Sequence, residues 1–109
     1  MAINYKVLGQ SSPDATTATD VYTVPAATEA VISTIIIANR AATAGTFRLS
    51  VRPNDATPAN EHYIAYDAPI YPNDSTTLTL GVTLDATDVI TAYCSSADMS
   101  VNVFGSEIS

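Results

Sequence analysis

The chain has 109 residues, a net charge of −7 and a pI near 4.1, so it has the length of one domain rather than two. Only four residues are Lys or Arg, too few for the basic patch that direct nucleic-acid binding requires. Cys94 is the only cysteine, which excludes an internal disulfide. We expect synthesis in a reducing cytoplasm without a signal peptide and without a membrane span, because no apolar run has the necessary length.

Threonine accounts for 15 residues and serine for 10, whereas Lys and Arg together number four. This composition favours strands and turns over helices. No stretch of helical length has a persuasive 3.6-residue apolar period. The chain is therefore predicted to be all-β.

The N-terminal region, residues 1–20, is predicted to be a short strand followed by a polar loop. Ile3, Tyr5 and Val7 share one face of this strand. Two roles remain open for the segment: the first strand of the domain, or an arm that docks on a neighbouring subunit. The β-sandwich domain proper is predicted over 21–109.

Residues 29–39 form the longest apolar, β-branched run and are predicted to be the central strand. Simple alternation places Ile32 and Ile36 on one face, and Val31, Ile35 and Ile37 on the other. Since both faces are apolar, we expect both to be covered. The domain core covers one, and a loop, an arm or another subunit covers the other.

Further short strands are predicted between turn signals, over 21–24, 45–52, 61–67, 76–84, 89–94 and 99–104. In the strand over 76–84, Leu78, Leu80, Val82 and Leu84 are expected to face inward, with Gly81 at a bulge. Altogether about seven or eight antiparallel strands indicate a Greek-key or jelly-roll-like β-sandwich.

No catalytic motif stands out, so the chain is predicted not to be an enzyme, with no cofactor and no metal. His62 is the only histidine and is expected at a surface or strand edge. Cys94 is expected to be a small buried hydrophobe. Aspartates 85, 88 and 98 are expected near one end of the sandwich, where Ca²⁺ is the alternative to ordinary solvated turns.

Two groups of side chains are candidates for recognition. Tyrosines 63, 66 and 71 form a candidate aromatic platform for a sugar or a partner protein, with core and interface packing as the other interpretation. Arginines 40, 48 and 52 are the only basic cluster, and they are either pairs for acidic residues of another subunit or solvated strand charges. The predicted assembly interface comprises Ile32, Ile35, Ile36, Ile37, Arg40, Arg48 and Arg52.

Several segments together resemble one class of protein, namely Tyr22–Pro25, Ile35–Arg40, Gly45–Leu49, Tyr63–Ile70, Leu84–Tyr93 and Val103–Ile108. Over about residues 20–109 the chain is similar to the small β-sandwich virion structural proteins of tailed bacteriophages, especially those of cyanobacterial and marine phages. The likeness is one of pattern and includes no catalytic residues.

The resemblance implies a capsid decoration, or cement, protein that stabilises the phage head by bridging capsomers. Such a protein is made in the host cytoplasm and acts in the virion. Its expected partners are the major capsid protein or other phage structural proteins, together with further copies of itself in a homo-oligomer. The alternatives are a tail, neck or fibre component and, less favoured, a carbohydrate-binding module.

Overall fold

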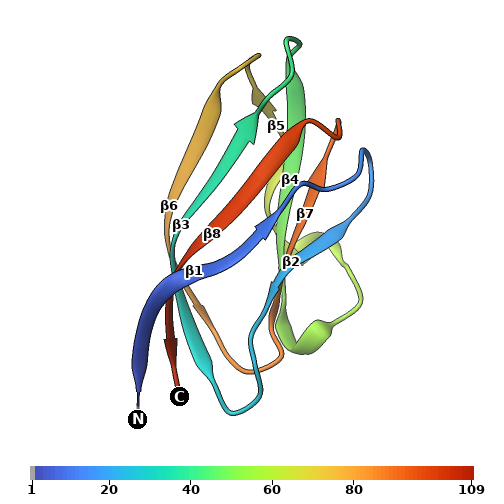
Figure 1. Ribbon diagram of the computed structural model, residues 1–109. Helices are drawn as coiled ribbons and strands as arrows, with labels where there is room; N and C mark the ends of the chain where they lie inside the picture. Colours follow the sequence, from blue (N-terminus) through green and yellow to red (C-terminus); the bar gives the residue numbers. More distant parts are fainter. Residues whose placement is uncertain (1) are drawn as a thin grey trace.

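The computed structural model describes residues 2–109, apart from the side chain of Leu80, and its regular secondary structure is almost entirely antiparallel strands (Figure 1). The strands are β1 (Ile3–Ser11), β2 (Thr19–Thr23), β3 (Glu29–Asn39), β4 (Gly45–Arg52), β5 (Tyr63–Ile70), β6 (Ser75–Leu84), β7 (Val89–Cys94) and β8 (Met99–Ile108). Two single-turn 3₁₀ helices, η1 (Pro53–Asp55) and η2 (Asn60–His62), lie between β4 and β5. The predicted all-β class is confirmed.

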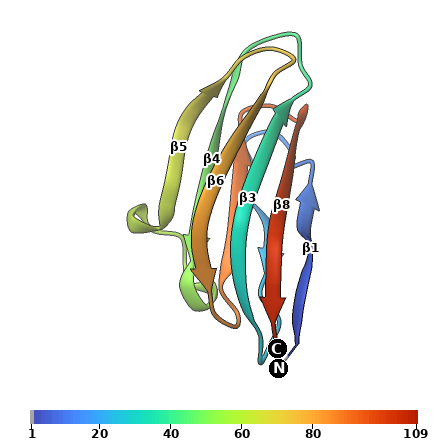
Figure 2. The same cartoon turned by 90° about the vertical axis from the view of Figure 1, so that its left-hand side faces the viewer.

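The strands form two four-stranded sheets, with the orders β1-β8-β3-β6 and β2-β7-β4-β5. Each strand of the first half of the chain pairs with one of the second half, so that β1 meets β8, β2 meets β7, β3 meets β6 and β4 meets β5. Figure 2 shows β6, β3, β8 and β1 side by side in one layer. This nested order is that of an eight-stranded jelly roll, which confirms the predicted Greek-key, jelly-roll-like sandwich.

The core lies between the two sheets. It is formed by the inward-pointing residues, which are every second residue along a strand. Strand β4 buries Phe47 and Leu49, and β8 buries Met99, Val101 and Val103. Their period of two is what the alternating sequence predicts for a strand with one covered face.

Strand β3 departs from simple alternation at Ser33. Between Ile32 and Thr34 the strand advances two residues, while its neighbour β8 advances only one. The extra residue is a β-bulge, and it inverts the faces of everything that follows it. Ile32, Ile35 and Ile37 therefore all lie in the core, whereas Ile36 faces outward and is half-buried. The predicted grouping of Ile32 with Ile36 was wrong for this reason.

Strand β6 keeps the predicted alternation. Leu84 is buried and Leu78 and Val82 pack against the core, while Thr77, Thr79 and Thr83 are exposed. Its register against β3 shifts between Thr79 and Val82, the stretch that contains the predicted bulge residue, Gly81. The expected inward position of Leu80 lies outside the described side chains.

Strand β1 lies along β8 of the same chain, from Ile3 opposite Ile108 to Ser11 opposite Val101. This is the arrangement of a first strand, one of the two roles considered for residues 1–20; Met1 is outside the described residues. Beyond the strand, the Ala2 N–H donates to the Ser109 carbonyl at 2.7 Å and the Ser109 N–H donates to the Ala2 carbonyl at 2.9 Å. The two ends of the chain are therefore adjacent (Figures 1 and 2).

Candidate interaction surfaces

Arg52 is a structural residue of the outer side of β4. Its Nε donates to Thr91 Oγ1 at 3.0 Å, and its Nη2 donates to Asp20 Oδ1 at 2.8 Å. Its Nη1 donates to the Ala56 carbonyl at 2.8 Å and lies 3.1 Å from Asp55 Oδ1. The buried guanidinium thus holds both β2 and the η1 turn against the sheet.

Arg40 has a comparable role at the end of β3. Its Nε donates to Ser100 Oγ at 3.0 Å, and its Nη2 donates to Ser12 Oγ at 2.9 Å and to the Ala97 carbonyl at 3.3 Å. These contacts join the β1–β2 loop to the β7–β8 loop. The side chain is therefore engaged within its own chain.

Arg48 lies in an aromatic cluster on the outer side of β4 and its neighbours. Its guanidinium carbon is 4.2 Å from the Tyr66 ring centre and 4.4 Å from that of Tyr93. Its Nε donates to Asp67 Oδ1 at 2.7 Å, and this hydrogen bond raises the pKa of the Arg48 guanidinium. Tyr63 meets Tyr66 edge to face, with ring centres 4.9 Å apart.

Only part of the predicted tyrosine platform is contiguous. Tyr63 and Tyr66 are in contact, whereas Tyr71 follows the far end of β5. Tyr66 and Tyr71 are 58% and 74% exposed. The observed cluster therefore consists of two of the predicted tyrosines together with Arg48 and Tyr93, which alternation in single strands could not bring together.

The predicted assembly interface is not one surface. Ile32, Ile35 and Ile37 are fully buried in the protomer core, so their side chains have no area to offer another subunit. The three arginines make the intramolecular contacts described above. Among the seven predicted residues, Ile36 is the apolar one that retains an outward-facing side chain.

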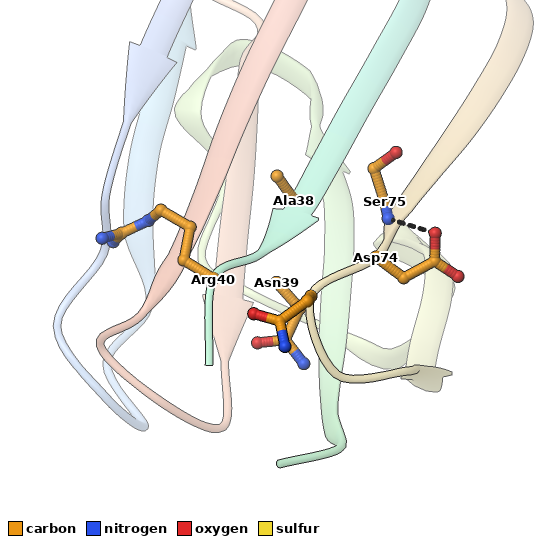
Figure 3. Close-up of a pocket in the computed structure, with 6 residues that line it drawn as sticks. Ala38, Asn39, Arg40, Asp74 and Ser75 are labelled. Atoms are coloured by element: carbon orange, nitrogen blue, oxygen red, sulfur yellow. Dashed lines mark hydrogen bonds between the residues drawn. The ribbon is translucent and has the colours of Figure 1, made fainter. Parts of the chain in front are cut away.

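A shallow hollow lies where β3 ends and β6 begins, lined by Ala38, Asn39, Arg40, Asn73, Asp74 and Ser75 (Figure 3). The buried Asn39 amide donates to the carbonyls of Thr43 and Tyr71, at 2.9 and 3.2 Å. The Ser75 N–H donates to Asp74 Oδ1 at 2.8 Å, and the Arg40 side chain extends away from Asp74 (Figure 3). These polar groups serve to hold the turns together.

The remaining candidates from the sequence also have structural partners. His62 Nδ1 accepts the Ala59 N–H at 3.1 Å within the η2 turn. Cys94 is buried in the core, and burial raises the pKa of its thiol to about 11. Within residues 2–109, no group of three or more His, Cys, Asp or Glu side chains is arranged to hold a metal ion.

The predicted grouping of aspartates 85, 88 and 98 at one end of the sandwich was wrong. Asp88 accepts the Asp85 N–H at 2.9 Å in the turn before β7, whereas Asp98 follows the other end of that strand. The error came from treating two loops as neighbours although the intervening strand, β7, spans the sheet between them.

The outer face of the β1-β8-β3-β6 sheet includes the second apolar face that the sequence predicted for residues 29–39, and it extends over four strands. The strand register places a set of apolar and hydroxyl side chains on it, namely Ile3, Tyr5, Val7, Val31, Thr34, Ile36, Thr77, Thr79, Thr83, Phe104, Ser106 and Ile108. Tyr5 is 84% exposed, and Ile3 and Val7 are about half exposed. Glu29, at one end of β3, is the one charged residue that the strand register places on this face within residues 2–109. At the other end of β3, the Arg40 guanidinium borders the face through its hydrogen bond to Ser100 Oγ.

The charged side chains of Lys6 and Glu107, which also belong to this sheet, point to its inner side instead. Lys6 Nζ lies 2.7 Å from Glu107 Oε1, and the Tyr22 hydroxyl donates to Glu107 Oε2 at 2.6 Å. The hydrogen bonds from Lys6 and Tyr22 hold the pKa of the Glu107 carboxyl below its usual range. Burial, followed by the bond to Glu107, raises the pKa of Tyr22. The cluster links β1 and β8 to β2 and leaves the outer face without these charges.

Comparisons with known protein families, with curated proteins and with solved structures find no match for this chain. In the part of the chain that the structure describes, no helix has the length and apolar character to cross a membrane.

Proposed function

We propose that the protein is a bacteriophage virion structural protein, a capsid decoration protein that lies on the head and bridges capsomers. The observation that carries the proposal is the almost uncharged outer face of the β1-β8-β3-β6 sheet on a chain with 11 acidic residues. We name this surface the uncharged face. Such exposed apolar surfaces are typical of sites of protein association.

The uncharged face is suited to association because few charges must lose their hydration when it is covered. The desolvation of charged side chains opposes binding, and the cores of protein interfaces are accordingly depleted of them. On this chain Lys6 and Glu107 pair with each other on the inner side of the sheet. A partner that covers the outer face therefore leaves their ion pair intact.

The fold provides support by analogy. Jelly rolls occur in viral capsid proteins and in lectins, but a fold by itself does not determine function. The analogy agrees with the resemblance to small phage virion proteins. It also leaves lectin-like binding as the competing class.

The proposed mechanism is mechanical. A standard protein interface buries about 800 Å² on each partner, and apolar area contributes roughly 25 cal/mol per Å² before the costs of association. Each copy that spans two capsomers opposes their separation. The effect is repeated at every site on the shell.

The test is binding of the purified protein to phage heads that lack it, measured by co-sedimentation and by the temperature at which the heads release their DNA. We expect a fixed stoichiometry and a higher release temperature. Tyr5→Asp should reduce binding by at least about tenfold, because it places a charge in the interface. Tyr71→Asp is the matched control: Tyr71 is also strongly exposed, at 74% against 84% for Tyr5, but lies outside the uncharged face.

The proposal that the protein lies on the head would be overturned if the wild-type protein did not bind heads, or if the Tyr5→Asp variant bound them normally. Protein that ignores heads but enters purified tails would support the alternative of a tail, neck or fibre component. The same pair of tyrosine variants then tests whether the uncharged face makes the tail contact.

A second candidate function is carbohydrate binding, which the cluster around Tyr66 favours. Its exposed ring lies beside the Arg48 guanidinium and the Asp67 carboxylate, so an apolar surface is combined with hydrogen-bonding groups. A glycan array should show binding that Tyr66→Ala removes and Tyr71→Ala retains. An array without any response contradicts this function.

A further inference from the structure

Two open sheets leave four strand edges, and the edges of this molecule differ in how well they are protected. The edge strands are β1 and β6 in one sheet, and β2 and β5 in the other. An unprotected edge presents unpaired N–H and C=O groups that can pair with another strand. Proteins usually block edges with charges, prolines, bulges or short strands.

Three of the four edges carry a charge together with at least one further such feature. Strand β5 contains Pro69, has Asp67 at a φ of 50° and shifts register twice against β4. Strand β2 is only five residues long, includes Asp20 and shifts register after it. Strand β1 has the inward-pointing Lys6 and a register shift at Leu8.

Strand β6 has neither charge nor proline over its ten residues, Ser75–Leu84. Its residues 75–79 pair with residues 38–34 of β3 without interruption, and its one register shift against β3 follows Thr79. The strand forms the border of its sheet, beyond β3 (Figures 1 and 2). Its residues 75–79 are therefore the least protected edge segment in the part of the chain that the structure describes.

The hydrogen-bond pattern of β3 shows which backbone groups of β6 are free for pairing. The Asn39 N–H donates to the Asp74 carbonyl, on the β6 side, at 2.8 Å, and the Arg40 N–H donates to the Asp98 carbonyl, on the β8 side, at 2.8 Å. Antiparallel pairs alternate in this way along the strand. The N–H groups of Thr77 and Thr79 consequently point away from β3, toward the open edge.

The inner side chains of β6 are also incompletely covered. Leu78 and Val82 face the core but are only half-buried, unlike the inward residues of the interior strand β3. A strand placed beyond β6 would cover them further. The same edge thus offers both unpaired backbone groups and apolar area.

We infer that β6 pairs with β6 of a second copy of this chain, antiparallel and about a twofold axis. A twofold axis makes one edge complementary to itself, and the two four-stranded sheets become one sheet of eight strands. The two uncharged faces then form a continuous surface. Asp74 and Asp85 flank the strand, so the pairing strengthens with salt as the repulsion between the copies is screened.

The first test is the mass in solution, measured by sedimentation equilibrium at about 0.02 and about 0.5 M salt. We expect twice the chain mass of 11.4 kDa, with tighter association at the higher salt. Thr77→Pro removes an edge N–H that β3 does not use and should yield a folded monomer, as judged by far-UV circular dichroism. Thr77→Val keeps the N–H and should remain a dimer.

A cysteine scan provides an independent readout. The single variants are Ser75→Cys, Thr77→Cys, Thr79→Cys and Thr83→Cys. Mild oxidation should form a disulfide between the two copies in those variants whose new cysteine lies nearest the twofold axis, and not in the others. Cys94 is buried and does not compete. Thr23→Cys, exposed on the β2 edge, is the control and should remain single chains.

Wild-type protein that is monomeric at both salt concentrations would overturn the inference. So would a folded Thr77→Pro variant that is still a dimer, or a scan without any β6 cross-link. The inference is separable from the proposed function, because Thr77→Pro leaves the uncharged face without a charge. A monomeric Thr77→Pro variant that still binds heads confirms the two contacts as distinct.

Discussion

Glu107 is the residue whose charge contributes most clearly to the fold. The bonds from Lys6 and Tyr22 hold its pKa below its usual range, so its stabilising effect is present above the pKa of the unfolded carboxyl, about 4.3. The effect is lost as the pH falls through the lower, folded pKa. Glu107→Gln should therefore lower the free energy of unfolding at pH 7 by about 1–3 kcal/mol, as measured by urea denaturation.

The control for this prediction is the same comparison at about pH 3, which is below the usual pKa of a carboxyl group. There the difference between wild type and Glu107→Gln should shrink, because the wild-type carboxyl begins to take up its proton. If the free energies of unfolding of wild type and Glu107→Gln differed by the same amount from pH 7 to pH 3, the stabilising role assigned to the Glu107 charge would be contradicted. Tyr22→Phe, which removes one of the two bonds to Glu107, should show a smaller change in the same direction.

Residue types were easier to predict than their partners. The sequence identified Arg40, Arg48 and Arg52 as the basic cluster, but gave no means of finding what they contact. Arg52 meets Asp20 from a distant strand, and Arg48 meets Asp67 across a hairpin. These pairs depend on which strands are neighbours, and alternation within one strand contains no such information.

At the scale of the element, the bulge in β3 separates two adjacent isoleucines. Ile35 is fully buried and Ile36 faces outward. Ile35→Asp should prevent folding, because a carboxylate in the core costs at least about 4 kcal/mol. Ile36→Asp should fold with a smaller loss of stability, and far-UV circular dichroism with urea denaturation distinguishes the two.

Equal losses in the two variants, or an unfolded Ile36→Asp beside a folded Ile35→Asp, would place the bulge elsewhere. The existence of β3 was predictable from its β-branched run, but the inversion was not. No glycine or proline lies within Glu29–Asn39 to indicate an irregularity. The extra residue, Ser33, is placed by the register with β8 and donates its hydroxyl to the Phe104 carbonyl at 3.2 Å.

At the scale of the whole molecule, the nested pairing joins parts of the chain that are far apart in sequence. Ile3 lies opposite Ile108, and among the described strands only β4 and β5 are both consecutive in the chain and neighbours in one sheet. Folding is slow when contacts are non-local, because loops must close before contacts form. We expect refolding within milliseconds to seconds, as monitored by stopped-flow tyrosine fluorescence. Refolding that is complete within microseconds would contradict this expectation.

The sandwich was predictable from the number and spacing of strands and turns, whereas the order of strands in each sheet was not. Alternating threonine and leucine determined the two faces of β6 correctly. Residues 29–39 indicated that a second face would be covered, but the extent of the uncharged face was not predicted, because it combines outward residues of four strands. Its recognition required the register between β1, β8, β3 and β6.

The paired backbone of Ala2 and Ser109 has a practical consequence for attaching other molecules. A peptide fused to either end leaves the protein at the same corner, so the choice of terminus does not change where the cargo is displayed. A short linker would also join the two ends into a closed ring, and new ends could then be opened at an exposed turn. The scaffold is thereby suited to carrying inserts without altering its strand order.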